Sequence, residues 1–188
     1  MSQTEINSIR DKLLLMRAQA REPGAFQELV EQYERRILYY VHRILGDDTD
    51  RADVLQEIWI RVFLRINTLR APEAFRAWLY KIAHDVAVTQ LRKRSRRETA
   101  GFTDEDVGDP VDTDDWNELE LLDRAELVHG ALAKLSLPHR EVLTLRFLEE
   151  LDLAEIAHVV GCRVGTVKSR LHYAKAEIRK LLEGDDRD

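Results

Sequence analysis

Residues 163–175, near the C-terminal end of the chain, carry side-chain types that bind nucleic acid. Arginine and lysine neutralise phosphates, while serine, histidine and tyrosine can form hydrogen bonds with base edges in the major groove. The candidate contacts are Arg163, Thr166, Lys168, Ser169, Arg170, His172 and Tyr173. Apolar residues recur between them at helical spacing, at Val164, Val167, Leu171, Ala174, Ile178 and Leu181. The pattern predicts a helix from Val164 to Leu182 with its polar residues on the outer side.

Two shorter helical segments precede this helix. Pro138 suits the first turn of one of them, whose apolar side we expect to comprise Val142, Leu145, Phe147 and Leu148. Asp152 with Glu155 predicts a capping box at the start of the next, and Gly161 predicts its end. A short helix, a tight glycine break and a longer basic helix are typical of a helix-turn-helix. An ordinary helical hairpin with a solvated charged face is the alternative.

A second candidate site lies on a helix predicted over residues 51–66. Asp53, Gln56 and Glu57 are spaced three and four residues apart, so they share one face of that helix. We expect the opposite face to be buried, through Val54, Leu55, Ile58, Trp59, Val62, Phe63 and Ile66. The pattern alone leaves open whether the polar face binds a partner or only water.

Charge is unevenly distributed along the chain, although its net value is only −6. Residues 1–97 hold 18 Lys and Arg against 13 Asp and Glu, and they end in a basic run from Arg92 to Arg97. Residues 98–123 hold 11 Asp and Glu and no Lys or Arg. The basic run predicts a phosphate-binding surface, because a helix end needs fewer cations than this. The acidic segment predicts a flexible linker.

The apolar periodicity is helical wherever it is sustained, so the predicted fold class is all-α. Helices are expected over residues 25–45, 51–66 and 73–97, with a loop at 67–72. We expect two small helical domains, residues 1–97 and 117–188, joined by an acidic linker at 98–116.

Several function classes find no support in the sequence. The chain has one cysteine, no His-Glu-x-x-His motif and no glycine-rich phosphate loop, so we expect no enzyme, no metal site and no cofactor. No apolar run is long enough to span a bilayer, and residues 1–10 do not resemble a signal peptide. A cytoplasmic protein without membrane insertion is therefore expected.

The ordered set of motifs resembles the extracytoplasmic-function (ECF) sigma factors of the sigma-70 family of bacterial RNA polymerase. The resemblance is carried by Asp53-Val54-Leu55-Gln56-Glu57, by Phe75-Arg76-Ala77-Trp78-Leu79-Tyr80-Lys81-Ile82-Ala83, and by Gly165-Thr166-Val167-Lys168-Ser169-Arg170-Leu171. It spans nearly the whole chain, and it implies a region 2-like domain followed by a region 4-like helix-turn-helix domain. A sigma factor binds core RNA polymerase, recognises the −35 and −10 promoter elements and helps to open the DNA.

The resemblance also implies a role for each candidate site. Core polymerase would bind Asp53, Val54, Leu55, Gln56 and Glu57. The −10 element would contact Asn67, Arg70, Arg76, Lys81, Arg92, Lys93, Arg94, Arg96 and Arg97, with the loop from Asn67 to Glu73 forming a pocket wall for a flipped base. The −35 element would be bound by the helix-turn-helix residues given above. The implied partners are core polymerase, promoter DNA and an anti-sigma factor.

The chain departs from the family pattern at a few positions. Asp85 stands where the family often has Asn, and Thr89 where it often has Asp, both on the helix that handles the −10 element. Arg163 replaces a frequent Ser or Pro, and Tyr173 a frequent Arg. We therefore expect unusual promoter preferences.

Two other functions remain as alternatives. A conventional helix-turn-helix regulator would bind a palindromic operator as a dimer and would not need polymerase. A sigma-like decoy would sequester an anti-sigma factor and bind no promoter.

Overall fold

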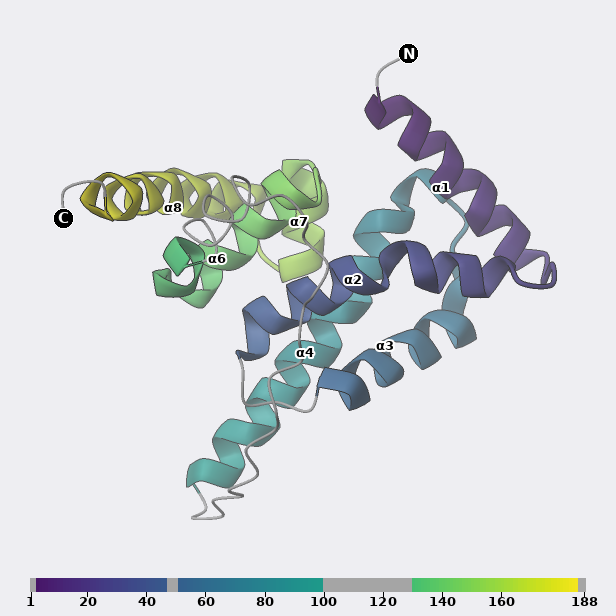
Figure 1. Ribbon diagram of the computed structural model, residues 1–188, viewed down its shortest axis with the longest axis horizontal. Helices are drawn as coiled ribbons and strands as arrows, with labels where there is room; N and C mark the ends of the chain where they lie inside the picture. Colours follow the sequence, from purple (N-terminus) through teal and green to yellow (C-terminus); the bar gives the residue numbers. More distant parts are fainter. Residues whose placement is uncertain (1–2, 47–50, 100–129, 186–188) are drawn as a thin grey trace. The chain divides into compact units, whose positions relative to one another are not determined.

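The computed structural model describes residues 3–46, 51–99 and 130–185, and within them the side chains of residues 9–46, 51–96 and 130–182. These residues form an N-terminal and a C-terminal unit, built from α1–α4 and α6–α8 respectively (Figure 1). No strand occurs among them, which confirms the all-α fold class. Most of the predicted linker and the start of the helical pattern at residues 117–129 lie outside the described residues.

The N-terminal unit comprises α1 (Gln3–Gln19), α2 (Ala25–Leu45), α3 (Arg51–Arg65) and α4 (Phe75–Thr99). Two 3-10 turns, η1 (Ile66–Thr68) and η2 (Pro72–Ala74), connect α3 to α4. Helix α2 packs against each of the other three helices. The side of α2 that faces the core is buried, with Leu29, Tyr33, Ile37, Tyr40 and Val41 fully covered. The three predicted helices are therefore confirmed, and α4 extends two residues beyond its predicted end.

Helix α3 and the residue after it bury most of the predicted apolar side, except Leu55, which is half-buried, and Phe63. Val54, Ile58, Trp59, Val62 and Ile66 are buried, as expected. The prediction that Phe63 points inward was wrong, because its side chain is 57% exposed. Phe63 lies at the edge of the buried face, where one side of its ring meets Phe26 edge-on with 5.1 Å between the ring centroids.

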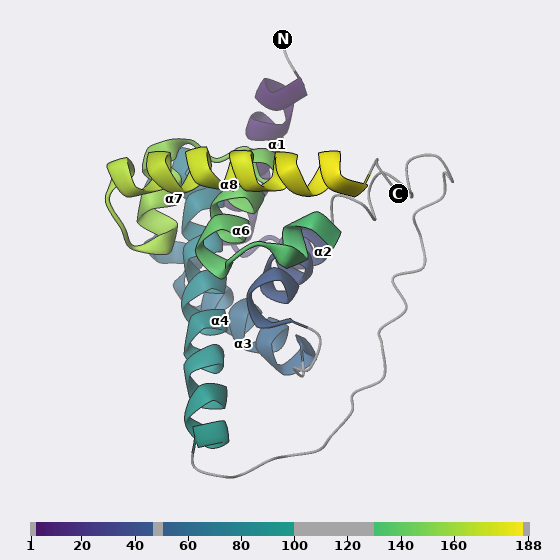
Figure 2. The same ribbon diagram turned by 90° about the vertical axis from the view of Figure 1, so that its left-hand side faces the viewer.

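The C-terminal unit contains α6 (Leu137–Leu143), the π-helical turn η3 (Thr144–Leu148), α7 (Leu153–Val160) and α8 (Val164–Asp185). In Figure 2 the long helix α8 runs past α7 and α6. Phe147 and Leu148 are exposed, contrary to the prediction that they join the apolar side with Val142 and Leu145. Both residues lie within the π turn itself, where each residue adds a smaller rotation than in an α-helix, so the regular helical repeat assigns them to the wrong face.

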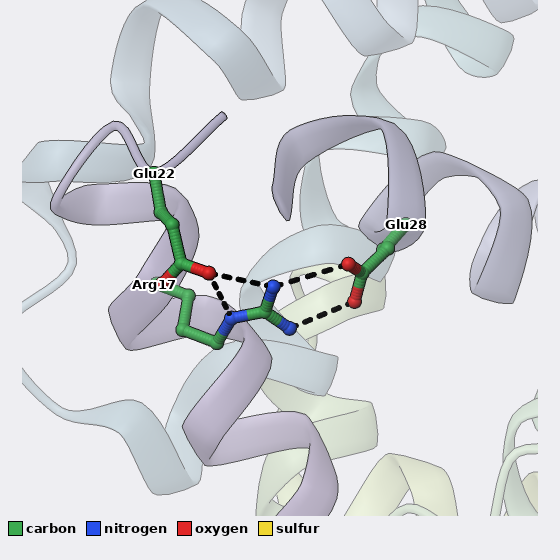
Figure 3. Close-up of polar contacts among 3 residues, drawn as sticks. All are labelled: Arg17, Glu22 and Glu28. Atoms are coloured by element: carbon green, nitrogen blue, oxygen red, sulfur yellow. Dashed lines mark hydrogen bonds and ion pairs between the residues drawn. The ribbon is translucent and has the colours of Figure 1, made fainter. Parts of the chain in front are cut away.

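The C-terminal end of α1 is linked to the start of α2 by an arginine that contacts two glutamates (Figure 3). The Arg17 guanidinium donates to both carboxylate oxygens of Glu28 at 2.8 and 3.1 Å, and its Nε donates to Glu22 at 2.9 Å. The Glu22 and Glu28 carboxylates raise the pKa of Arg17, and the Arg17 guanidinium holds the pKa of Glu28 below its ordinary value of 4.5. This bidentate geometry fixes the orientation of α1 more firmly than a single contact would.

Arg17→Met should lower the free energy of unfolding by an amount that depends on pH. Because folding lowers the pKa of Glu28, its contribution to stability is fully present above 4.5 and is lost as the pH falls through the folded-state value. The difference between wild type and Arg17→Met should therefore be constant near neutral pH and shrink in acid. Urea unfolding from neutral pH to about pH 3 measures it. A difference that stays constant into acid would contradict the prediction.

Candidate nucleic-acid interface

The outer face of α3 carries the first candidate site. Asp53, Gln56 and Glu57 are exposed on it, while Leu55 is half-buried and Val54 is only 3% exposed. Val54 therefore supports this face from below. Glu57 pairs with Arg61 one turn later, which holds its carboxylate along the helix surface. Asp53, Gln56 and Glu57 are thus presented together, and a partner could bind all three at once.

Two apolar residues extend the same face. Ile60 and Leu64 follow Gln56 at successive four-residue steps, and they are 52% and 72% exposed. Together with Phe63 they form an exposed apolar cluster beside the polar residues. Apolar surface next to polar groups is typical of protein interfaces rather than of a merely solvated face. Sequence reasoning missed Ile60 and Leu64, although the four-residue spacing from Gln56 was a usable signal.

The connection between α3 and α4 forms the second candidate site. Asn67 and Arg70 are exposed on it, and the buried Ile66 anchors it to the core. The Thr68 hydroxyl donates to the Arg65 carbonyl at 2.7 Å, which closes the turn after α3. From α1, the Gln19 side-chain amide donates to the carbonyls of Ile66 and Leu69, both at 2.8 Å. The loop is therefore held from two sides.

Helix α4 places its basic residues in different environments. Arg76 is half-buried near the Tyr33 phenol. Burial and the Asp11 carboxylate raise the pKa of Tyr33, and the charge of Arg76 partly offsets that rise. Lys81 forms an ion pair with Asp85 at 2.7 Å. The departure at Asp85 is thus paired, and the departure at Thr89 donates its hydroxyl to the Asp85 carbonyl at 2.6 Å. Lys81 is therefore less available to phosphates than its position on the helix suggests.

The end of α4 carries the basic run. In both views the last turns of α4 project beyond α2 and α3 (Figures 1 and 2). Arg92, Lys93 and Arg96 are exposed and Arg94 is half-buried, while the Arg97 side chain lies outside the described ones. This projecting segment can therefore approach a phosphate backbone without steric hindrance from its own unit.

The helix-turn-helix geometry is present in the C-terminal unit. Asp152 accepts from the backbone N–H groups of Ala154 and Glu155 at 2.7 and 2.8 Å, and the Glu155 carboxylate accepts from Asp152 N–H at 2.7 Å. These bonds form the predicted capping box of α7. Gly161 ends α7 in the left-handed conformation, with φ of 67°, as glycine most easily does.

Helix α8 begins directly after this turn and is held by its apolar side. The Arg163 carbonyl accepts from the N–H groups of Thr166 and Val167 at the start of the helix, and the Arg163 side chain is exposed. Val167, Leu171 and Ala174 are buried. The predicted contact residues Lys168, Ser169, His172 and Tyr173 are exposed, while Thr166 and Arg170 are half-buried. Of the apolar residues predicted on the inner side of α8, Val167, Leu171 and Ala174 are thus buried, whereas Val164 is exposed and Ile178 and Leu181 are half-buried.

Two contacts further define the outer face of α8. The Ser169 hydroxyl donates to the Thr166 carbonyl at 3.0 Å, and the rings of His172 and Tyr173 meet edge-on at 5.4 Å. Lys175 lies over the exposed Phe147 ring, 5.0 Å from its centroid. The outer face of α8 and the adjoining Phe147 therefore form a surface of basic, hydroxyl and aromatic side chains.

The described residues contain no group of three His, Cys, Asp or Glu side chains placed to hold a metal ion. Among the described helices, none is both long and apolar enough to cross a bilayer.

The family models of sigma-70 region 2 and sigma-70 region 4 match residues 29–97 and 125–178 respectively. The chain is 35% identical over 182 residues to the RNA polymerase sigma-H factor of Pseudomonas aeruginosa, covering 93% of this chain and 94% of that protein. It is 29% identical over 171 residues to the ECF RNA polymerase sigma factor SigW of Bacillus subtilis, covering 86% and 90%. The chain belongs to the sigma-70 family, in its ECF group.

A solved structure shares this fold. The sigma factor RpoE of Bartonella quintana, in its co-crystal structure with the anti-sigma factor NepR, matches with a TM-score of 0.65 and 21% identity. The match covers 85% of this chain and 98% of that one.

Asp152→Ala should destabilise the helix-turn-helix by about 1 kcal/mol, because two backbone N–H groups at the start of α7 lose their acceptor. Hydrogen exchange at the amides of the C-terminal unit over a urea series, including Ala154 and Glu155, measures the loss. Asp152→Asn is the control, since its side-chain oxygen can still cap the helix. Equal stability of the Ala and Asn variants would contradict the prediction.

Proposed function

We propose that this chain is a promoter-specificity subunit that binds core RNA polymerase and directs it to promoters with defined −35 and −10 elements. The observation that carries the proposal is the outer face of α3, where exposed Gln56 and Glu57 lie beside exposed Ile60 and Leu64. A regulator that only bound DNA would have no use for such a face. Core polymerase would dock there, with Asp53 extending the contact and Val54 and Leu55 supporting it.

The N-terminal unit would also bind the −10 element. Asn67 and Arg70 on the loop would contact the flipped base and its neighbouring phosphates, since both side chains are exposed. The basic run from Arg92 would follow the phosphate backbone upstream. Arg76 and Lys81 are already engaged within the protein, so we assign them smaller roles. The remaining basic contacts fall on Lys93, Arg94, Arg96 and Arg97.

The C-terminal unit would read the −35 element through α8 in the major groove. Arg163, Thr166 and Arg170 would contact phosphates, while Lys168, His172 and Tyr173 reach base edges. The Ser169 hydroxyl donates a hydrogen bond to the Thr166 carbonyl. Toward a base, Ser169 would therefore offer only its oxygen as an acceptor. Adenine N6 and cytosine N4 present suitable donors in the major groove.

The two units would together recognise one promoter, each binding one of its two elements. We propose the domain limits 1–97 and 117–188, with the acidic segment 98–116 as the tether between them. A tether makes promoter spacing part of specificity, because the second contact forms at an effective concentration that the linker sets. The proposed activity requires no catalysis by this chain and would take place in the cytoplasm, where the promoters are.

An anti-sigma factor would bind a surface that polymerase also needs. The apolar cluster of Ile60, Phe63 and Leu64 suits such a competitor, because it offers buried area to whichever protein covers it.

Run-off transcription with core polymerase and a library of promoter fragments tests the proposal. Wild type should direct discrete starts, and the double variant Gln56→Ala with Glu57→Ala should lose core binding by at least about tenfold, because two central polar contacts disappear. Gln27→Ala with Glu31→Ala is the matched control, since these residues form an exposed hydrogen-bonded pair on α2. If wild type binds no core, the proposal fails; if it binds core without directing starts, the decoy function replaces it.

Asp85→Asn should tighten the promoter complex, because it removes a carboxylate from the DNA-facing helix and releases Lys81. The slope of log affinity against log salt should steepen by about one. Anisotropy of a labelled promoter fragment with the reconstituted polymerase, over a salt series, measures both. Glu34→Gln on α2 is the control for loss of one exposed carboxylate. Identical slopes for wild type and Asp85→Asn would show that Lys81 stays away from phosphates.

A further inference from the structure

The loop between α3 and α4 is held by a side chain far away in the sequence. The Gln19 amide donates to Ile66 O and Leu69 O, each at 2.8 Å, across separations of 47 and 50 residues. Ile66 O also accepts from Leu69 N–H at 3.3 Å. The turn from Ile66 to Leu69 is therefore closed by a backbone hydrogen bond, and the Gln19 amide binds the carbonyls at both of its ends.

The two carbonyls that accept from Gln19 belong to residues next to the exposed side chains of the loop. Asn67 lies between Ile66 and Leu69, and Arg70 follows immediately. Both Asn67 and Arg70 are exposed, whereas Gln19 is half-buried behind them. A change in the turn would therefore move the two exposed side chains directly.

Gln19 is itself held in place. It is the last residue of α1, and Leu15 and Ala18 bury the preceding turn. Arg17, two residues earlier, bonds to Glu22 and Glu28 and so fixes this end of α1 against α2 (Figure 3). Helix α1 also contacts both η1 and η2. The amide is thus a rigid donor pair rather than a mobile surface group.

We infer that Gln19 is a positioning residue for −10 recognition, which rests on the proposed function of the loop. Its two hydrogen bonds select one conformation of residues 66–70, in which Asn67 and Arg70 point toward the DNA. A pocket for a flipped base must return the cost of unstacking through well-placed contacts, so small displacements of its wall reduce discrimination. Gln19 therefore affects base selection without touching DNA.

Three substitutions at Gln19 separate the donor role from packing. Gln19→Met keeps the length of the side chain and removes both donors. Gln19→Glu keeps the shape and places a carboxylate against two carbonyls. Gln19→Lys keeps donors that can reach the same carbonyls. Gln27→Met is the matched control, because Gln27 bonds only to Glu31 on the exposed side of α2.

The readout is the ratio of run-off transcription from a selected promoter to that from single-base −10 variants of it, with core polymerase present. Gln19→Met should reduce this ratio on the order of tenfold and Gln19→Glu further, because two hydrogen bonds to the loop are lost. Gln19→Lys and Gln27→Met should keep the wild-type ratio. Discrimination against −35 variants and the affinity for core should stay unchanged in all four proteins.

The outcomes separate this inference from the proposed function. If wild type shows no −10 dependence at all, the proposed function of the loop fails. If wild type discriminates and Gln19→Met discriminates equally, or if −10 and −35 discrimination fall together, only the positioning role is overturned. Should the Met and Glu variants fail to fold by circular dichroism, Gln19→Lys decides: a retained −10 ratio supports the role of the donors, and a lost ratio refutes it.

Discussion

The N-terminal unit depends on the burial of one face of α2, which contacts α1, α3 and α4. Tyr33 meets Phe75 and Tyr40 meets Tyr80 edge-on, with centroids 5.5 and 5.2 Å apart. Each such aromatic side chain contributes about 2 kcal/mol through burial, and edge-on pairing adds to this. Because Phe75 and Tyr80 lie on α4, these contacts fix the rotation of that helix about its axis. That rotation decides which of its basic residues reach solvent.

In the C-terminal unit, apolar contacts fix the rotation of one helix, and capping residues fix the ends of another. Val167, Leu171 and Ala174 fix the rotation of α8, while the capping box at Asp152 and the left-handed Gly161 fix where α7 begins and ends. The side chains proposed to contact bases thus owe their direction to apolar residues one position away. In both units, core packing determines which polar side chains of the helix face outward.

Much of this could be predicted from the sequence, since it depends on local patterns. The helices at 25–45 and 51–66, the capping box and the glycine stop follow from periodicity and from the chemistry of caps. The bond from Gln19 to the 66–69 turn could not be predicted, because nothing local relates residues so distant in sequence. The exposure of Phe147 and Leu148 escaped prediction because a π turn changes the repeat, and that of Phe63 because it lies at the margin of a buried face.

The exposed cluster of Ile60, Phe63 and Leu64 has a consequence for the free protein. In water, the free energy of the system falls when another apolar surface covers these side chains, and that surface can be the same cluster on a second copy. The isolated chain should therefore self-associate more as its concentration rises. The surface that suits a partner thus also limits how concentrated the free protein can become without one.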